Sequence, residues 1–356
     1  MAGAGAPGAG APGGGGSAGA AQAGAAGAAG AGAGAGGSSA GSAGMGGAAG
    51  ASGGSAGGAG GAGGAGGAPS NNGLKAVAYL PNYHGSFASW AAKLDFNKLT
   101  HLNLAFALAT DSNGWNMGAS DSDVKAIVDK AHAANVKVLA SLGGGGGDQS
   151  VIARYKTASN IVPLVDNLET FLERLNLDGA DIDIESPGNM GSATNYGPFV
   201  AQVAKILKPK GKLVTAAVAQ YIVEGANGYS DTTLNTWDFI NVMIYENSMS
   251  PYTSTLKWWT DTKHIPKANL TLGVPFFGKA DNPYTEFDYK AIIAADSTAW
   301  SKNQANVNGR TVNYAGVDMI KQLTTLSKTY GGIMFWEWAE DTTDEHSLWK
   351  TIQAGY

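Results

Sequence analysis

Three carboxylic acids alternate with apolar residues in the segment LDGADIDIE, near the middle of the chain. Successive side chains of a strand point to opposite faces, so Asp181, Asp183 and Glu185 share one face while Ile182 and Ile184 share the other. Carboxylates held this close inside a protein cannot all ionise, and a carboxyl that keeps its proton near neutral pH can act as a general acid. The pattern predicts acid–base chemistry at the C-terminal end of this run, where Glu185 stands.

Two alternatives to acid–base chemistry stay open for this acidic run. The acids could be solvated on an edge strand or paired with buried Lys or Arg, although the interiors of the other predicted strands hold no basic residue. They could also bind a hard divalent cation, which prefers oxygen ligands. Such sites usually draw ligands from several strands, and no His stands at the C-terminal end of a strand here. We favour catalytic carboxylates and expect no metal.

Eight short β-rich segments, separated by stretches of helical periodicity, must position these acids. The predicted strands are Lys75–Pro81, His101–Ala107, Lys137–Leu142, Gly179–Glu185, Leu213–Ala219, Phe239–Tyr245, Leu270–Pro275 and Gly332–Trp338. Strands that alternate with helices are typical of a parallel sheet, and eight such units in about 280 residues indicate an α/β fold of the (β/α)8 TIM barrel type. Glu185 would then stand at the C-terminal mouth, where barrel enzymes do their chemistry.

The interval between the seventh and eighth predicted strands, from Gly278 to Gly331, is too long for a single helix. Within it, Asn308-Gly309 is flanked by apolar and β-branched residues, which is a hairpin signal. We predict a short β insertion there rather than a second domain.

The N-terminal part of the chain has a different composition from the rest. It contains no Lys, Arg, Asp, Glu or aromatic residue before Lys75, and 32 of the 54 glycines lie in the first 73 positions. Such a tract has no side chains to bury and loses much backbone entropy on ordering. We therefore predict that residues 1–73 form a disordered Gly/Ala/Ser-rich linker and that residues 74–356 form one catalytic domain.

Charge and composition exclude several classes of function. The net charge is −5 and no strong basic cluster occurs, so we expect no nucleic-acid partner. The chain has no Cys, which excludes disulfides, thiolate metal sites and a cysteine nucleophile. No apolar run approaches the roughly 18 residues of a membrane span.

The chain resembles glycoside hydrolase family 18, which comprises chitinases and endo-β-N-acetylglucosaminidases. The family's strand-four signature, Asp-Gly-x-Asp-x-Asp-x-Glu, is met from Asp178 to Glu185 without a gap. Four more family motifs occur in the family's order: SLGG from Ser141 precedes the signature, and MIY from Met243, LGVPFFG from Leu272 and GGIMFW from Gly331 follow it. The resemblance covers essentially residues 75–356 and implies a glycosidase without a cofactor.

The resemblance implies that β-1,4-linked N-acetylglucosamine polymers are hydrolysed with retention of configuration. In this family the substrate's own 2-acetamido oxygen attacks the anomeric carbon, and the enzyme supplies one acid/base. Glu185 would donate the proton and later activate water. Asp183 would accept the acetamido N–H and stabilise the oxazolinium intermediate, and Tyr245 would hydrogen-bond the acetamido oxygen.

The resemblance also implies supporting and substrate-binding residues. Asp181, held by Tyr79 and Ser141, would hold Asp183 and tune the general acid, while Trp336 would form the apolar floor under the sugar. The implied substrate-binding residues are Trp336, Met243, Tyr79, Ser141, Phe106 and Glu246. Glu246 departs from the family pattern, which has Asp after the strand-six Tyr, and this puts the shape of the leaving-side subsite in doubt.

Other residues are weaker candidates. The glycine run Gly143–Gly147 lacks the Lys-Ser/Thr ending of a phosphate-binding loop and is interpreted as a mobile loop after a strand. Five further tryptophans are candidates for stacking on sugar, with packing inside the domain as the alternative. They are Trp115, Trp258, Trp259, Trp300 and Trp338.

Three functional hypotheses follow. The first is an endo-acting chitinase, because the short interval before strand eight implies a shallow, open groove. The second is an endo-β-N-acetylglucosaminidase acting on the chitobiose core of N-glycans, and the third is a non-catalytic chitin-binding lectin. We expect an extracellular or surface-anchored, bacterial, monomeric protein whose N-terminal tract is a tether with a root-mean-square span of roughly 45 Å.

Overall fold

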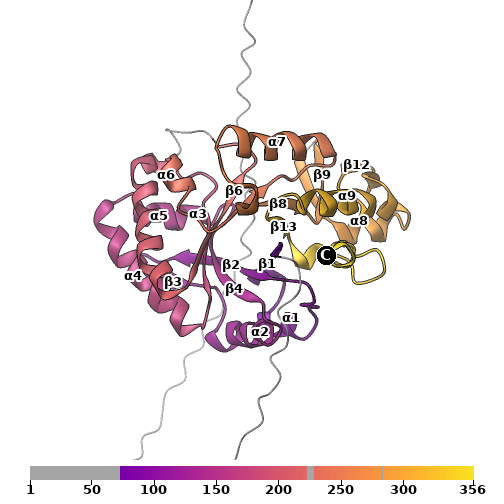
Figure 1. The fold of residues 1–356 in the computed structure, drawn as a ribbon. Helices are drawn as coiled ribbons and strands as arrows, with labels where there is room; N and C mark the ends of the chain where they lie inside the picture. Colours follow the sequence, from indigo (N-terminus) through magenta and orange to yellow (C-terminus); the bar gives the residue numbers. More distant parts are fainter. Residues whose placement is uncertain (1–72, 223–227, 282–283) are drawn as a thin grey trace, which may run out of the picture. The chain divides into compact units, whose positions relative to one another are not determined.

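The computed structural model describes residues 73–222, 228–281 and 284–356. Eight parallel strands ring the centre of this part and helices cover their outside (Figure 1). The first barrel strand pairs with both the second and the last, so the sheet closes on itself. The predicted (β/α)8 barrel is confirmed. The linker predicted for residues 1–73 lies, apart from Gly73, outside the described residues and stays a prediction.

All eight predicted strands are present. The barrel strands are β1 (Lys75–Pro81), β2 (His101–Ala109), β4 (Lys137–Gly143), β5 (Gly179–Asp183), β6 (Leu213–Ala219), β7 (Ile240–Met243), β8 (Leu270–Pro275) and β13 (Gly332–Trp336). A two-residue strand, β3 (Trp115–Asn116), pairs antiparallel with the end of β2.

Three strands end two residues earlier than predicted. The sequence pattern places Glu185, Tyr245 and Trp338 inside strands, whereas β5, β7 and β13 end before them. The reason in β5 is its neighbour: Asp183 pairs with Gly143, the last residue of β4, so the residues after it have no strand on that side to bond. Glu185 therefore stands on the first loop residues past the sheet, at the mouth.

The helices lie outside the strands because each has one apolar face. Along α4, for example, Ile161, Leu164 and Leu168 recur at helical spacing and are buried. The helices are α1 (Phe87–Ala91), α2 (Asp121–Ala133), α3 (Asp148–Tyr155), α4 (Ala158–Arg174), α5 (Ala193–Leu207), α6 (Asp231–Leu234), α7 (Met249–Asp261), α8 (Tyr289–Ala295), α9 (Val317–Ser327) and α10 (Leu348–Gly355). Within the described ranges, no helix combines the length and apolarity that crossing a bilayer requires.

The segment between β8 and β13 contains the predicted β insertion. Its four strands form one antiparallel sheet in the order β10-β9-β12-β11. They are β9 (Phe277–Asp281), β10 (Tyr284–Asp288), β11 (Gln304–Val307) and β12 (Arg310–Asn313). Asn308 and Gly309 link the last two with φ of 53° and 80°, the left-handed conformation that tight hairpins require.

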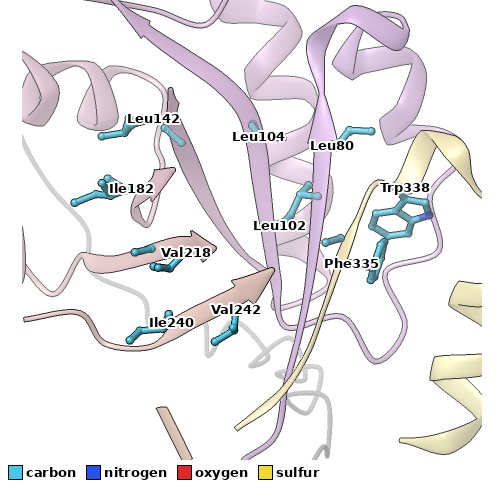
Figure 2. Close-up of a cluster of buried hydrophobic side chains, with 14 of the residues drawn as sticks. Leu80, Leu102, Leu104, Leu142, Ile182, Val218, Ile240, Val242, Phe335 and Trp338 are labelled. Carbon is cyan, nitrogen blue, oxygen red and sulfur yellow. The ribbon is translucent and has the colours of Figure 1, made fainter. Parts of the chain in front are cut away.

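The strands separate two interiors. Their outward side chains pack under the helices in a large apolar cluster, called the shell here, part of which Figure 2 shows. Their inward side chains fill the barrel lumen, whose apolar members are Val77, Tyr79, Ala217, Phe239 and Met334. Ile182 belongs to the shell, while Asp181 and Asp183, its neighbours on β5, are buried on the other side of the strand.

Candidate active site

Asp181 is buried at the centre of the lumen, where four side chains hold it. Tyr79 Oη at 2.7 Å and Ser141 Oγ at 3.0 Å donate to one carboxylate oxygen. Thr215 Oγ1 at 2.6 Å and Asn241 Nδ2 at 3.3 Å donate to the other. Burial raises the pKa of Asp181, and these four hydrogen bonds act against that rise. Since all four neighbours donate, they satisfy the ionised carboxylate and fix its orientation.

Asp183, the next inward residue of β5, has a different environment. It is only 3% exposed, and its Oδ1 has no hydrogen-bond partner in the described part of the chain. Burial raises the pKa of Asp183 well above its ordinary value, and the nearby Glu185, Asp181 and Asp148 raise it further. The Asp183–Glu185 pair therefore keeps a shared proton to higher pH than isolated carboxyls do, and Asp183 presents one unpaired oxygen.

Glu185 is exposed at the mouth of the barrel. Partial burial of its carboxyl raises its pKa, and the negative charges of Asp148 and Glu286 raise it further. Gly145 lies against it, because a Cβ on Gly145 would stand 3.1 Å from Glu185 Oε1. A carboxyl that is accessible and keeps its proton towards neutral pH has the properties of a general acid.

An aromatic wall lies beside the carboxylates. Trp336, at the end of β13, stacks on Phe106 with ring centroids 5.4 Å apart and an interplanar angle of 19°. Its ring centroid lies 5.6 Å from that of Tyr79. Phe106 also packs over Gly144, where any Cβ would collide with the ring. Trp336 and Phe106 are both partly exposed and give the site an apolar surface on which a pyranose ring can pack.

Tyr245 and Met243 extend from the end of β7 and pack on the apolar residues of the lumen. The Tyr245 ring meets Phe277 edge to face at 5.6 Å, and its Oη lies 3.9 Å from Met334 Sδ. Burial raises the pKa of Tyr245 well above its ordinary value, and the charges of Asp183 and Glu185 add to the rise. The phenol therefore stays protonated and can donate a hydrogen bond.

A cavity of about 190 Å³ adjoins Tyr245. Its lining residues come from β7, β8 and the insertion, and they are Tyr245, Glu246, Asn247, Pro275, Phe277, Lys279, Asn313 and Tyr314. Lys279 Nζ donates to the Tyr245 carbonyl at 3.3 Å and lies 5.5 Å from the centroid of the Phe277 ring. Glu246, which departs from the family pattern, thus shares a polar pocket with an amine at the edge of the site.

The structure adds four polar residues to the site that the sequence patterns do not single out. Thr215 and Asn241 bond Asp181, and Thr271 Oγ1 donates to Asn241 Oδ1 at 2.7 Å. Each is a polar residue at an inward position of an otherwise apolar strand, and that signal is present in the sequence. The fourth, Asp148, is the first residue of α3 and lies near enough for its charge to raise the pKa values of Asp183 and Glu185, a position that no strand pattern indicates.

The candidate tryptophans lie in different environments. Trp115 and Trp259 are buried, and their indole N–H groups donate to the carbonyls of Leu164 and Gln220. Trp338 is buried in the shell against Phe335, so the suggestion that it stacks on sugar in the cleft is wrong. Trp258 and Trp300 are partly exposed.

The site is a column of coupled carboxylates under an aromatic wall. Among the residues the structure describes, no group of three or more His, Asp or Glu side chains is placed to hold a metal ion. The model of the glycosyl hydrolases family 18 matches residues 75–341, which is most of the chain. The chain belongs to glycosyl hydrolase family 18. The resemblance carried by the five motifs is therefore confirmed.

Relatives within family 18 are moderately similar. The chain is 26% identical over 263 residues to an acidic endochitinase of Cucumis sativus, a match that covers 70% of this chain and 76% of that protein. It is 29% identical over 135 residues to a chitinase-like effector of Moniliophthora perniciosa, over 35% of this chain and only 30% of the effector. The crystal structure of a family 18 chitinase from the chitin utilization locus of Flavobacterium johnsoniae superposes with a TM-score of 0.70 at 25% identity, covering 79% and 93% of the two chains.

Proposed function

We propose that this protein is an endo-acting chitinase that hydrolyses β-1,4-linked N-acetylglucosamine polymers with retention of configuration. Glu185 protonates the leaving glycosidic oxygen while the substrate's acetamido oxygen attacks the anomeric carbon, which forms an oxazolinium ion. Glu185, now a carboxylate, then takes a proton from the water that opens this ion. The raised pKa of Glu185 supports this role, because the acid must be protonated before the first step.

The observation that carries the proposal is the unpaired Oδ1 of Asp183. A buried acceptor without a partner costs free energy, so its retention calls for a donor that arrives with a ligand. The N–H of a 2-acetamido group is such a donor. Asp181, fixed by four hydrogen bonds, lies one inward position below Asp183 on β5, and its charge favours a proton on the pair above it.

Two further groups fit the same substrate. The Tyr245 phenol, which stays protonated, can donate to the acetamido oxygen and hold it near the anomeric carbon. Trp336 and Phe106 offer the apolar face of the pyranose a surface to pack on. Met243 contributes apolar wall, while the pocket containing Glu246 and Lys279 takes a polar substituent of the sugar chain.

The decisive experiment is a product time course on the hexamer of N-acetylglucosamine, with analysis of the anomer released first. An endo-acting, retaining enzyme gives internal cleavage products that appear as the β-anomer. Cellohexaose should be inert because it lacks the acetamido nucleophile. Turnover of cellohexaose, or an initial α-anomer, would contradict the substrate-assisted mechanism.

Two alternatives predict other outcomes in the same assays. An endo-β-N-acetylglucosaminidase would release glycans from a glycoprotein and leave chitin oligomers intact. A lectin would bind the hexamer without cleaving it at any pH from about 4 to 8. The chitinase is favoured over the lectin because Asp183 and Glu185 are both present and share a raised pKa, a property that binding alone does not require.

We propose further that the catalytic domain acts outside the cell, at the surface of a bacterium, as a monomer. Fractionation of the producing cells tests the location, since a purely cytosolic protein would refute it. Sedimentation of the purified protein tests the monomer.

A further inference from the structure

The glycine run Gly143–Gly147, at the end of β4, lies against the end of β5 and the loop that carries Glu185. Gly144 N–H donates to the Asp183 carbonyl at 2.8 Å. A Cβ on Gly143 would stand 2.7 Å from that same carbonyl oxygen and 3.1 Å from the Cα of Asp148. Gly143 has a φ of 101°, a conformation open to glycine, so the close approach of the two loops depends on residues without side chains. The run thus allows α3 to pack against the loop after β5, which carries Glu185.

This arrangement places Asp148 next to the loop that carries Glu185. Its side chain belongs to the first residue of α3 and is 3% exposed. It accepts hydrogen bonds from the backbone N–H of Ser186, the residue after Glu185, and from Gln149 Nε2 at 3.1 Å. Tyr155, at the other end of α3, donates to the Pro187 carbonyl at 2.8 Å. Helix α3 therefore holds the loop on the C-terminal side of Glu185 at two points.

The hydrogen-bond partners of Asp148 indicate its charge state. Burial raises the pKa of Asp148, and the hydrogen bonds from Gln149 and Ser186 act in the opposite direction. Both partners donate and neither needs a proton from Asp148, so the ionised form satisfies them. A buried negative charge next to Glu185 makes loss of the Glu185 proton less favourable.

We propose that Asp148 is a positioning residue for the general acid: it fixes the backbone that carries Glu185, and its negative charge favours the protonated form of that side chain. The inference rests on the proposed role of Glu185. Asp148 makes these contacts from outside the acidic strand, so it is not one of the carboxylates of the strand-four signature. The ionisable groups that face Glu185 are Asp183 on β5, Asp148 on α3, Glu286 on β10, Tyr245 after β7 and Tyr229.

The test compares Asp148→Asn with Asp148→Ala on the soluble hexamer, with kcat/KM measured across pH. The asparagine keeps an acceptor for the Ser186 N–H but has no charge. We expect its alkaline limb, where Glu185 loses the proton needed for catalysis, to move to lower pH by roughly half a unit to one unit. On the acid side, where Glu185 is protonated in both variants, the kcat of the asparagine variant should fall less than that of the alanine variant. The alanine loses both functions and should show the same shift plus a fall in kcat of about tenfold.

A matched control is Asp341→Asn. Asp341 is another buried aspartate that accepts backbone N–H groups, from Leu348 and Trp349 at the start of α10, but it is not among the charges that shift the pKa values of the three column acids. Its variant should lower the melting temperature without moving the alkaline limb. Asp148→Ser, which keeps an oxygen acceptor without charge, replaces the asparagine variant if that variant does not fold.

The outcomes separate the two proposals. A wild-type enzyme that leaves the hexamer intact overturns the chitinase assignment. An active wild type whose alkaline limb is unchanged by Asp148→Asn overturns the role of Asp148 alone. Equal losses of kcat in the asparagine and alanine variants at every pH would also overturn it, because they would indicate a purely structural residue.

Discussion

The lumen and the shell of the barrel are built from the same eight strands but differ in chemistry. On β5, Ile182 packs into the shell among aliphatic side chains, whereas Asp181 and Asp183 on either side of it face the lumen. Both regions are buried, yet the lumen contains carboxyls whose pKa values burial raises, where the shell has apolar and aromatic side chains. The difference indicates that the shell supports the fold, whereas the lumen gathers the buried carboxyls that we propose take part in the chemistry.

Within the lumen, the hydrogen bonding of the three acids changes along the column. Asp181 has four donors, whereas Asp183 has an oxygen with none in the described part of the chain. Glu185 reaches the solvent. Satisfaction of hydrogen bonds thus decreases from the centre of the barrel towards its mouth. The unsatisfied end of the column is where a substrate can supply the missing partner.

The strongest test of the lumen is Glu185→Gln. The amide keeps the shape of the side chain but cannot donate the proton, so we expect kcat to fall by about a thousandfold or more. Binding of the hexamer, measured by calorimetry, should stay nearly intact. The melting temperature should not fall, because Glu185 is an exposed residue past the end of β5 and contributes little to packing. A variant that kept more than about a tenth of the wild-type rate would sink the assignment of Glu185 as general acid.

The matching test of the shell is Leu102→Ala on β2. Leu102 is fully buried under the helices and appears in Figure 2. Its truncation should lower the free energy of unfolding by about 2–4 kcal/mol, since a cavity is left behind. Denaturant titration measures this loss. The kcat and the pH profile of the folded enzyme should stay within about twofold to threefold of wild type, and a shifted pH profile would break the separation between the two interiors.

The period of two along the strands is what makes the fold and the column predictable. The alternation of side chains between the two faces of a strand assigns Ile182 to the shell and the acids to the lumen. The hairpin signal at Asn308-Gly309 locates the insertion. A prediction from this alternation fails where a strand ends. It places Trp338 near Trp336 because it lies two residues further on, but the chain leaves the sheet after Trp336 and turns into a short 3₁₀ helix.

Contacts made through loops are not predictable from the strand pattern. Asp148 lies 35 positions before Asp183 in the sequence, and it reaches the column because a glycine run folds back over the catalytic loop. Composition alone suggests a mobile loop for this run. Its backbone N–H at Gly144 bonds the Asp183 carbonyl, a long-range contact that continues the pairing of β4 with β5.

A smaller change within the lumen is Tyr245→Phe. It removes one hydroxyl that we propose holds the acetamido oxygen, while the ring keeps its edge-to-face contact with Phe277. We expect kcat to fall by about tenfold to a hundredfold with a change of less than about threefold in KM. Steady-state kinetics on the hexamer measures both. An unchanged kcat would show that the acetamido group is oriented by Asp183 alone.

The smallest expected effect concerns a buried carboxylate outside both regions. Glu337 follows β13, is 1% exposed and contacts Tyr83 Oη at 3.2 Å and His84 Nε2 at 3.0 Å. Burial raises its pKa from 4.5 to about 8. Between pH 4.5 and about pH 8 the folded protein holds a proton that the unfolded chain has released. The free energy of unfolding therefore falls as pH rises, and the contribution of Glu337 to stability is lost above about pH 8.

Glu337→Gln removes this titration while keeping the shape of the side chain. The variant should therefore gain stability relative to wild type as pH rises from about 6 to about 9, by an amount on the order of 1 kcal/mol, or a few degrees in melting temperature. Thermal unfolding followed by circular dichroism at several pH values measures the slope of melting temperature against pH for the variant and for wild type. Parallel slopes would mean that Glu337 ionises without cost in the folded state.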